Sequence, residues 1–76
     1  MAHNDPILTA FGKRVKMLRL EQGLSQEELA YRCGFYRTYI GMVERAERSI
    51  TLCNVFKIAK GLNISIKDLF DYDTKD

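Results

Sequence analysis

The chain has 76 residues, of which 46% are hydrophobic and 29% charged, with 12 Lys and Arg against 10 Asp and Glu. This length and hydrophobicity are typical of one small globular domain with one core, and they exclude a wholly disordered chain. No apolar run approaches the roughly 20 residues that a membrane helix needs, and the start lacks a signal-peptide pattern. We therefore expect a cytoplasmic protein with no membrane partner.

The cysteines and the histidine do not indicate a metal site. Cys33 and Cys53 are far apart in the sequence, and the one histidine, His3, lies near the N-terminus. These are too few ligands for zinc. We expect no metal and no cofactor, and we interpret both cysteines as small, reduced core residues.

No stretch alternates with period two for long enough to predict a strand, whereas helix signals recur along the chain. The first predicted helix starts at Asp5, which can cap it with Pro6 in the first turn, and ends at Gly23. Its apolar residues recur at steps of three and four and form one stripe. The stripe consists of Leu8, Phe11, Val15 and Leu18.

Charge is unevenly distributed. The first helix is crowded with Lys13, Arg14, Lys16 and Arg19. The end of the chain, residues 71–76, is an acidic tail. This distribution suits a polyanionic partner at one end of the molecule. We interpret Lys13, Arg14 and Lys16 as a solvated face, with a phosphate contact as the alternative.

The second predicted helix has the clearest start. Ser25 and Glu28 form an S-x-x-E capping box, and Leu24 and Leu29 have the spacing of a hydrophobic staple. Gly34 ends this helix after about two turns, so it needs tertiary packing to persist.

The fourth and fifth predicted helices follow a third one that runs from about Tyr36 to Arg45 or Ala46. The fourth starts at Thr51 and stops at Gly61. Its predicted inward face consists of Val55, Phe56, Ala59 and Leu62. The fifth repeats the pattern of the second, with cap, acid and staple residues Ser65, Asp68, Ile64 and Leu69. Short connections between all five predict one compact all-α domain.

The third helix has two different faces. At 100° per residue, the side predicted to pack inward consists of Tyr36, Tyr39, Ile40 and Val43. The opposite strip consists of Arg37, Thr38, Gly41, Met42 and Arg45. Since glycine costs about 1 kcal/mol relative to alanine in a helix, Gly41 indicates a notch where the helix can lie close to another surface. Arg and Thr suit the base edges of a DNA major groove, so we predict groove reading rather than a merely solvated face.

The segment LSQEELAYRCGFYRTYIGMVERAERS, residues 24–49, resembles the helix-turn-helix of the lambda-repressor-like (Cro/C1, or XRE) DNA-binding family. The similarity extends from about Phe11 to Phe70. The segment RTYIGMVERAERSITL is especially similar to the controller proteins of restriction–modification systems, which bind DNA as dimers and regulate their own and a neighbouring gene. The resemblance implies a compact five-helix domain over residues 1–76, with its core at about 6–70 and the second and third helices forming the helix-turn-helix.

The resemblance also implies roles for individual residues. Those in base-reading positions are Arg37, Thr38 and Met42, although the family often has a polar residue where Met42 stands. Those in positions that bind the DNA backbone are Ser25, Gln26, Tyr36, Tyr39, Arg45 and Arg48. A structural ion pair is implied between Arg19 and Glu44.

Two tyrosines depart from this pattern. Tyr36 stands where a small capping residue is usual, and tyrosine caps poorly, so it either reaches the backbone with its hydroxyl or simply packs. Tyr39 faces inward by angle, which favours core packing, with a phosphate contact as the alternative.

A homodimer is expected because one such domain reads only about four or five base pairs, too few to find one site in a genome. The interface is expected on the fourth and fifth helices, whose apolar surface exceeds what a small core can absorb. Ile64 and Leu69 are assigned to the staple. The residues expected in the interface are therefore Ile66, Phe70 and Tyr72, with core capping by all of them as the alternative.

We therefore predict a sequence-specific regulator that binds double-stranded DNA as a homodimer on a pseudopalindromic operator, with RNA polymerase as a candidate further partner. An enzyme is not expected, because the sequence has no nucleophile–base set, phosphate-cradling loop or paired carboxylates. The alternative is an antitoxin-type protein-binding module that also binds its own promoter. Such a module usually needs a further segment to wrap its partner, and only about six residues follow Phe70.

Overall fold

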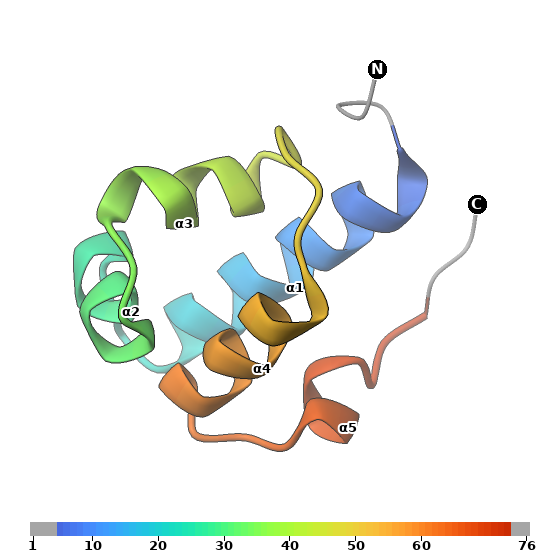
Figure 1. The fold of residues 1–76 in the computed structure, drawn as a ribbon. Coiled ribbons are helices and arrows are strands. Elements are labelled where there is room, and N and C mark those ends of the chain that lie inside the picture. The colour runs from blue at the N-terminus through green and yellow to red at the C-terminus, as the bar shows by residue number, and fades with distance from the viewer. Residues whose placement is uncertain (1–4, 74–76) are drawn as a thin grey trace.

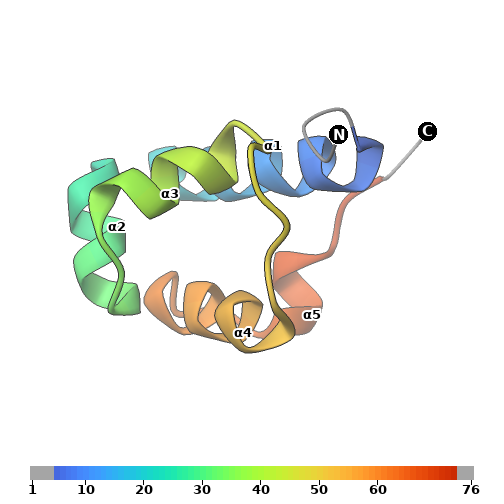
Figure 2. The same cartoon turned by 45° about the horizontal axis from the view of Figure 1, so that its top comes forward.

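The structure, a computed structural model, describes residues 5–73, and this part of the chain contains five α-helices and no strand. The helices are α1 (Pro6–Glu21), α2 (Gln26–Cys33), α3 (Arg37–Glu44), α4 (Leu52–Gly61) and α5 (Ile66–Leu69). Figure 1 shows them in chain order from blue to red. α1 and α3 form one layer and α4 and α5 the other, with α2 across one end (Figure 2). The predicted order of five helices is confirmed.

Some predictions concern residues beyond this range. His3 lies outside the described residues, and the predicted acidic tail is described only as far as Asp73. From Asp5 to Asp73, no helix combines the length and the apolar character that crossing a bilayer requires.

Four of the five helices start with a side-chain cap. At α2 the Ser25 hydroxyl accepts the Glu28 N–H at 2.9 Å, and the Glu28 carboxylate accepts the Ser25 N–H at 2.8 Å, which completes the predicted capping box. These bonds from Ser25 hold the pKa of Glu28 below its usual value. The other capping residues are Asp5 at α1, Thr51 at α4 and Ser65 at α5. α3 has no side-chain cap, because Tyr36 at this position makes no capping hydrogen bond.

Four of the five helices are followed by a left-handed residue. Gly23 and Gly34, with φ of 70° and 81°, follow α1 and α2 as predicted. After α3 and α4 the left-handed residues are Ala46 and Asn63, with φ of 60° and 59°. Asparagine tolerates this conformation, whereas alanine does not adopt it readily, so the turn after α3 is strained.

The core receives apolar side chains from every helix. Its fully buried members include Val15, Leu29, Ile40, Ile58, Leu62 and Leu69. The prediction that Phe56 faces inward is wrong, because this side chain is 51% exposed. The inward stripe of α4 runs through Val55, Ile58, Ala59 and Leu62. Phe56 is rotated about 100° from Val55 around the helix and therefore reaches the surface.

The two cysteines have different surroundings. Cys33 is buried as predicted, and burial raises the pKa of its thiol to about 11. It therefore stays a protonated thiol at neutral pH. Cys53 was also predicted to be a core residue, and this is wrong because it is exposed. It lies between Leu52 and Phe56 on the outward side of α4.

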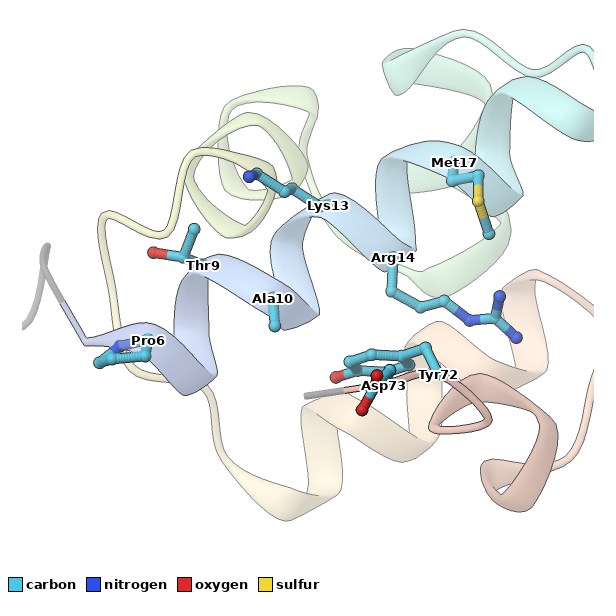
Figure 3. Close-up of a pocket in the computed structure, with 8 residues that line it drawn as sticks. All are labelled: Pro6, Thr9, Ala10, Lys13, Arg14, Met17, Tyr72 and Asp73. Carbon is cyan, nitrogen blue, oxygen red and sulfur yellow. The ribbon is translucent and has the colours of Figure 1, made fainter. Parts of the chain in front are cut away.

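Arg14 attaches α5 to α1. Its guanidinium donates to the Leu69 carbonyl at 3.1 Å and to the Asp68 carbonyl at 2.7 Å. It also lies 5.7 Å from the centre of the Tyr72 ring (Figure 3). The interpretation of Arg14 as part of a solvated face is therefore wrong, because these carbonyls at the end of α5 hold it. Its neighbours Lys13 and Lys16 are exposed, as predicted.

α1 and α3 approach each other closely at Gly12. A Cβ atom at this position would lie 2.6 Å from the Val43 carbonyl oxygen and 2.7 Å from that of Glu44. Both obstacles are backbone atoms, which cannot rotate away as a flexible side chain could. Gly12 therefore sets how closely the end of α3 packs on α1.

We expect Gly12→Ala to lower the free energy of unfolding by about 1–3 kcal/mol, because the added methyl group forces the two helices apart. Urea denaturation followed by circular dichroism measures this change. Lys16→Ala, at an exposed position on the same helix, is the matched control and should change stability by no more than about 0.5 kcal/mol. Equal stabilities for the two variants would show that the close approach is not needed.

Candidate nucleic-acid interface

α2 and α3 are joined by a tight turn. Gly34 takes the left-handed conformation, and the Phe35 N–H then donates to the Ala30 carbonyl at 2.8 Å. The Phe35 ring is half-buried and lies 4.6 Å from the ring of Tyr39, centre to centre. The turn and this ring contact fix the direction in which α3 leaves α2.

The inner face of α3 packs on the core as predicted for Ile40 and Val43, which are both buried. Tyr39 is half-buried, and its hydroxyl oxygen accepts a hydrogen bond from Asn54 of α4 at 3.0 Å. The prediction that Tyr36 packs inward is wrong, because this residue is 85% exposed. It precedes the helix in an extended conformation, so the helical angle does not apply to its side chain.

The outer face of α3 presents part of the predicted strip. Arg37 and Thr38, in the first turn, are exposed, and Met42 is half-buried. Gly41 is buried, and a Cβ atom there would lie 3.0 Å from Nη1 of Arg45. The expectation of an open notch at Gly41 is therefore wrong in this structure, because the Arg45 side chain folds back along the helix and covers it.

Arg45 is held in this position by Glu47. Its Nε and Nη2 atoms donate to the two carboxylate oxygens of Glu47 at 2.8 and 3.2 Å. These hydrogen bonds and the adjacent negative charge raise the pKa of Arg45 above its already high usual value. Arg45 carries a permanent positive charge, and in this structure its guanidinium is paired with the carboxylate of Glu47.

A buried ion pair connects α1 to the end of α3. Arg19 donates to Glu44 through Nε at 2.7 Å and Nη2 at 3.0 Å, and its Nη1 donates to the Leu24 carbonyl at 2.9 Å. The exposed fractions of the two side chains are only 8% and 3%. The side chain of Gln26, the first residue of α2, donates to Glu44 at 3.1 Å. One carboxylate thus binds α1, α2 and α3 together.

The remaining residues predicted at the interface lie on its borders. Ser25 is exposed at the start of α2, where its hydroxyl is used in the capping box. Gln26 lies beside the end of α3 through its bond to Glu44. Arg48 is exposed in the loop between α3 and α4. None of these three residues belongs to α3 itself.

A separate surface combines exposed apolar residues of α4 and α5. Leu52, Phe56 and Ile66 line one groove and are 77%, 51% and 37% exposed; we call them the α4–α5 apolar patch. Ile66 was predicted in a dimer interface, whereas Phe56 was assigned to the inward face of the fourth helix and Leu52 was not singled out. The spacing of four between Leu52 and Phe56, out of phase with the Val55 stripe, is the signal that identifies them.

The two other residues predicted in the dimer interface are in a different situation. Phe70 is 42% exposed and stacks on Phe11 with ring centres 5.3 Å apart. Tyr72 is half-buried, and its hydroxyl oxygen is buried without a hydrogen-bond partner among the described residues. Burial raises the pKa of this hydroxyl, while the charge of Arg14 opposes the rise. Tyr72 is thus less available to a partner than Ile66 or Phe70.

The described residues contain no group of three or more His, Cys, Asp or Glu side chains placed to hold a metal ion. The candidate site is therefore a surface of exposed Arg and Thr side chains on a rigidly attached helix. Such a surface can donate hydrogen bonds to base edges and phosphates.

Comparison with known proteins agrees with this geometry. Residues 15–69 match the helix-turn-helix family. The chain is 45% identical over 75 residues to the control protein C.BamHI of Bacillus amyloliquefaciens, covering 97% of this chain and 90% of the relative. It is 47% identical over 57 residues to the control protein C.SmaI of Serratia marcescens, covering 75% and 68% of the two chains.

A solved structure extends the similarity to the fold. The crystal structure of the restriction–modification controller protein C.AhdI from Aeromonas hydrophila matches with a TM-score of 0.80 at 46% identity, covering 83% of this chain and 96% of that one. The chain belongs to the helix-turn-helix family of DNA-binding transcriptional regulators. Its relatives within that family include restriction–modification controller proteins, and the chain is a transcriptional regulator of this type and not an enzyme, as predicted.

We expect Glu44→Ala to lower the free energy of unfolding by about 3–5 kcal/mol, because it leaves the buried Arg19 without its carboxylate partner. Glu47→Ala breaks an exposed ion pair and should cost less than about 1 kcal/mol. Urea denaturation, or the loss of helical circular dichroism if the first variant is already unfolded, compares the two. Equal losses would mean that the buried pair does not hold the helices together.

Proposed function

We propose that the protein binds as a homodimer to a pseudopalindromic operator and regulates its own gene and a neighbouring gene of a restriction–modification system. This function places it in the cytoplasm with the DNA and makes RNA polymerase a candidate partner. The observation that supports it best is the outer face of α3, where Arg37 and Thr38 are exposed on a helix tied down by the Arg19–Glu44 pair. The control-protein relatives favour this function over an antitoxin-type module.

In this proposal the start of α3 reads bases. In helix-turn-helix proteins the N-terminal residues of the second helix contact base edges in the major groove. Arg37 is the first residue of α3 and can donate two parallel hydrogen bonds to guanine, and Thr38 can bond to a base or touch a methyl group. Met42, one turn further and half-buried, suits apolar contact with a thymine methyl group.

The surrounding residues position the protein on phosphates. The backbone N–H groups at the start of α2, next to Ser25 and Gln26, carry the positive end of a helix dipole. Arg48 and the exposed Tyr36 lie beside α3 and can reach the phosphates of the groove walls. Tyr39 accepts from Asn54 through its oxygen, which leaves its own O–H free to donate to a phosphate.

Arg45 has the same proposed role. It follows α3 directly, and its side chain is 58% exposed although it is paired with Glu47. To contact a phosphate, the Arg45 guanidinium must therefore either separate from the Glu47 carboxylate or bind the carboxylate and the phosphate together.

We expect Arg37→Ala to weaken operator binding by about 1–3 kcal/mol and to relax preference at one base pair, because it removes a bidentate base contact. Arg48→Ala should instead weaken binding to all sequences alike and reduce the salt slope by about one, because it removes a phosphate contact. Fluorescence anisotropy on a panel of single-base operator variants at several salt concentrations separates the two effects. Identical behaviour of both variants on the panel would contradict the division into base-reading and phosphate-binding residues.

The dimer interface is proposed at the α4–α5 apolar patch, extended by Phe70. A patch on one protomer can pack on the same patch of a second copy around a two-fold axis. Such a dimer must place its two α3 helices about 34 Å apart, one turn of DNA. Figure 2 supports this arrangement, because α4 lies in the layer opposite to α3 and leaves the outer face of α3 uncovered.

We expect Phe56→Glu to convert the dimer to a monomer, because two carboxylates would be buried across the two-fold axis. The variant should keep its fold, since Phe56 is half-exposed in the single chain. Tyr31→Glu, at an 87% exposed aromatic residue of α2, is the matched control and should remain a dimer. Analytical ultracentrifugation distinguishes these states. A Phe56→Glu variant that sediments as the wild type would exclude this patch as the interface.

A further inference from the structure

The starting observation is that the glycine of the recognition surface is covered by an arginine. Nη1 of Arg45 lies only 3.0 Å from the point where a Cβ of Gly41 would be. Any larger residue at position 41 would push the guanidinium outward. The absence of a side chain at Gly41 therefore makes room within the protein for Arg45.

The turn after α3 brings the partner of Arg45 into reach. The N–H of Glu47 donates to the Met42 carbonyl at 2.9 Å, and the N–H of Ala46 donates to the Val43 carbonyl at 3.0 Å. This pair of bonds reverses the chain directly after the helix. It requires the left-handed conformation at Ala46, which a residue other than glycine adopts at a cost, and the buried Ala46 methyl group holds the turn in the core.

Arg45 binds Glu47 through the same kind of contact that an arginine makes with a phosphate. A planar guanidinium binds a carboxylate and a phosphate with the same two parallel N–H donors. Glu47 occupies the donors Nε and Nη2 of Arg45 with both of its oxygens. The other nearby acid, Glu44, is already engaged by Arg19 and Gln26, so Glu47 is the acid that holds this arginine.

The ion pair between Arg45 and Glu47 is also weak enough for a phosphate to replace the carboxylate. The exposed fractions of its two side chains are 58% and 43%, in contrast to 8% and 3% for the pair between Arg19 and Glu44. Exposed ion pairs of this kind contribute little to stability, whereas a DNA phosphate that takes the same donors also releases bound counterions.

We propose that Glu47 is an internal substitute for a DNA phosphate: it holds Arg45 across Gly41 in the free protein, and a phosphate displaces it when DNA binds. Glu47 is thus a positioning residue that lowers the affinity of the protein for any duplex. The inference rests on the proposed function, because it assigns Arg45 to a phosphate. It leaves base reading by Arg37 and Thr38 unchanged.

The test measures binding of E47Q to two duplexes by fluorescence anisotropy at low salt. One duplex is taken from immediately upstream of the gene that encodes the protein, and the other is a scrambled duplex of equal length and composition. E47Q should bind both more tightly by about two- to fivefold, the range that corresponds to an exposed ion pair. The ratio of the two affinities should stay the same.

Two controls separate this effect from a general change in charge. E21Q, at the exposed last residue of α1, changes net charge equally and should tighten binding less. In an R45Q background, E47Q should give no more than the E21Q effect, because no arginine remains to be released. An undiminished gain in the R45Q background, or weaker binding by E47Q alone, would overturn the proposal.

A measurement without DNA gives an independent answer. The Nε–Hε proton of Arg45 should exchange slowly with water in the NMR spectrum of the wild type and at least several-fold faster in E47Q. Unchanged exchange would overturn the proposal as well. If the wild type does not prefer the upstream duplex, the proposed function fails, but the E47Q comparison on the scrambled duplex still decides the role of Glu47.

Discussion

The position of α3 depends on one buried ion pair. Arg19 and Glu44 are almost completely removed from water, which is costly for two charges unless their donors and acceptors are all satisfied. Here the guanidinium has two carboxylate oxygens and the Leu24 carbonyl, and the carboxylate also receives the Gln26 amide. These partners come from α1, the start of α2 and the end of α3. A displacement of any of the three helices would leave a buried charge without a partner, so the pair restrains the helix-turn-helix geometry.

Backbone packing restrains the end of α3 as well. The missing side chain at Gly12 lets α1 approach the carbonyl oxygens of Val43 and Glu44, while Arg19 holds the Glu44 side chain two turns further along α1. The last turn of α3 is thus restrained through both its main chain and its side chain. Short helices have little stability of their own, so α3, with 8 residues, depends on these contacts to present a rigid surface.

Local signals in the sequence predicted the helices well, because caps and staples act over a few residues. Ser25 with Glu28 and the left-handed Gly34 were found at the predicted places. Two of the errors come from helical periodicity applied to a residue that does not follow it. Phe56 was grouped with the inward stripe although it lies 100° from Val55, and Tyr36 was placed on a helix that starts only after it. The controller-type fold followed from the resemblance, whereas only the tertiary structure shows that Leu52 and Phe56 of α4 line one groove with Ile66 of α5.

Long cationic side chains were the least predictable part of the site, because their partners are distant or depend on an unusual turn. Arg14 binds carbonyls more than fifty positions away, and Arg45 turns back to Glu47 only because Ala46 is left-handed. Together with Arg19, three arginines are bonded to other parts of the protein. These contacts fix the positions of three guanidinium groups on the protein, while the net charge of the whole chain is only +2. A small net charge gives little general attraction to DNA, so in the proposed complex the contacts of α3 would supply a larger share of the binding free energy.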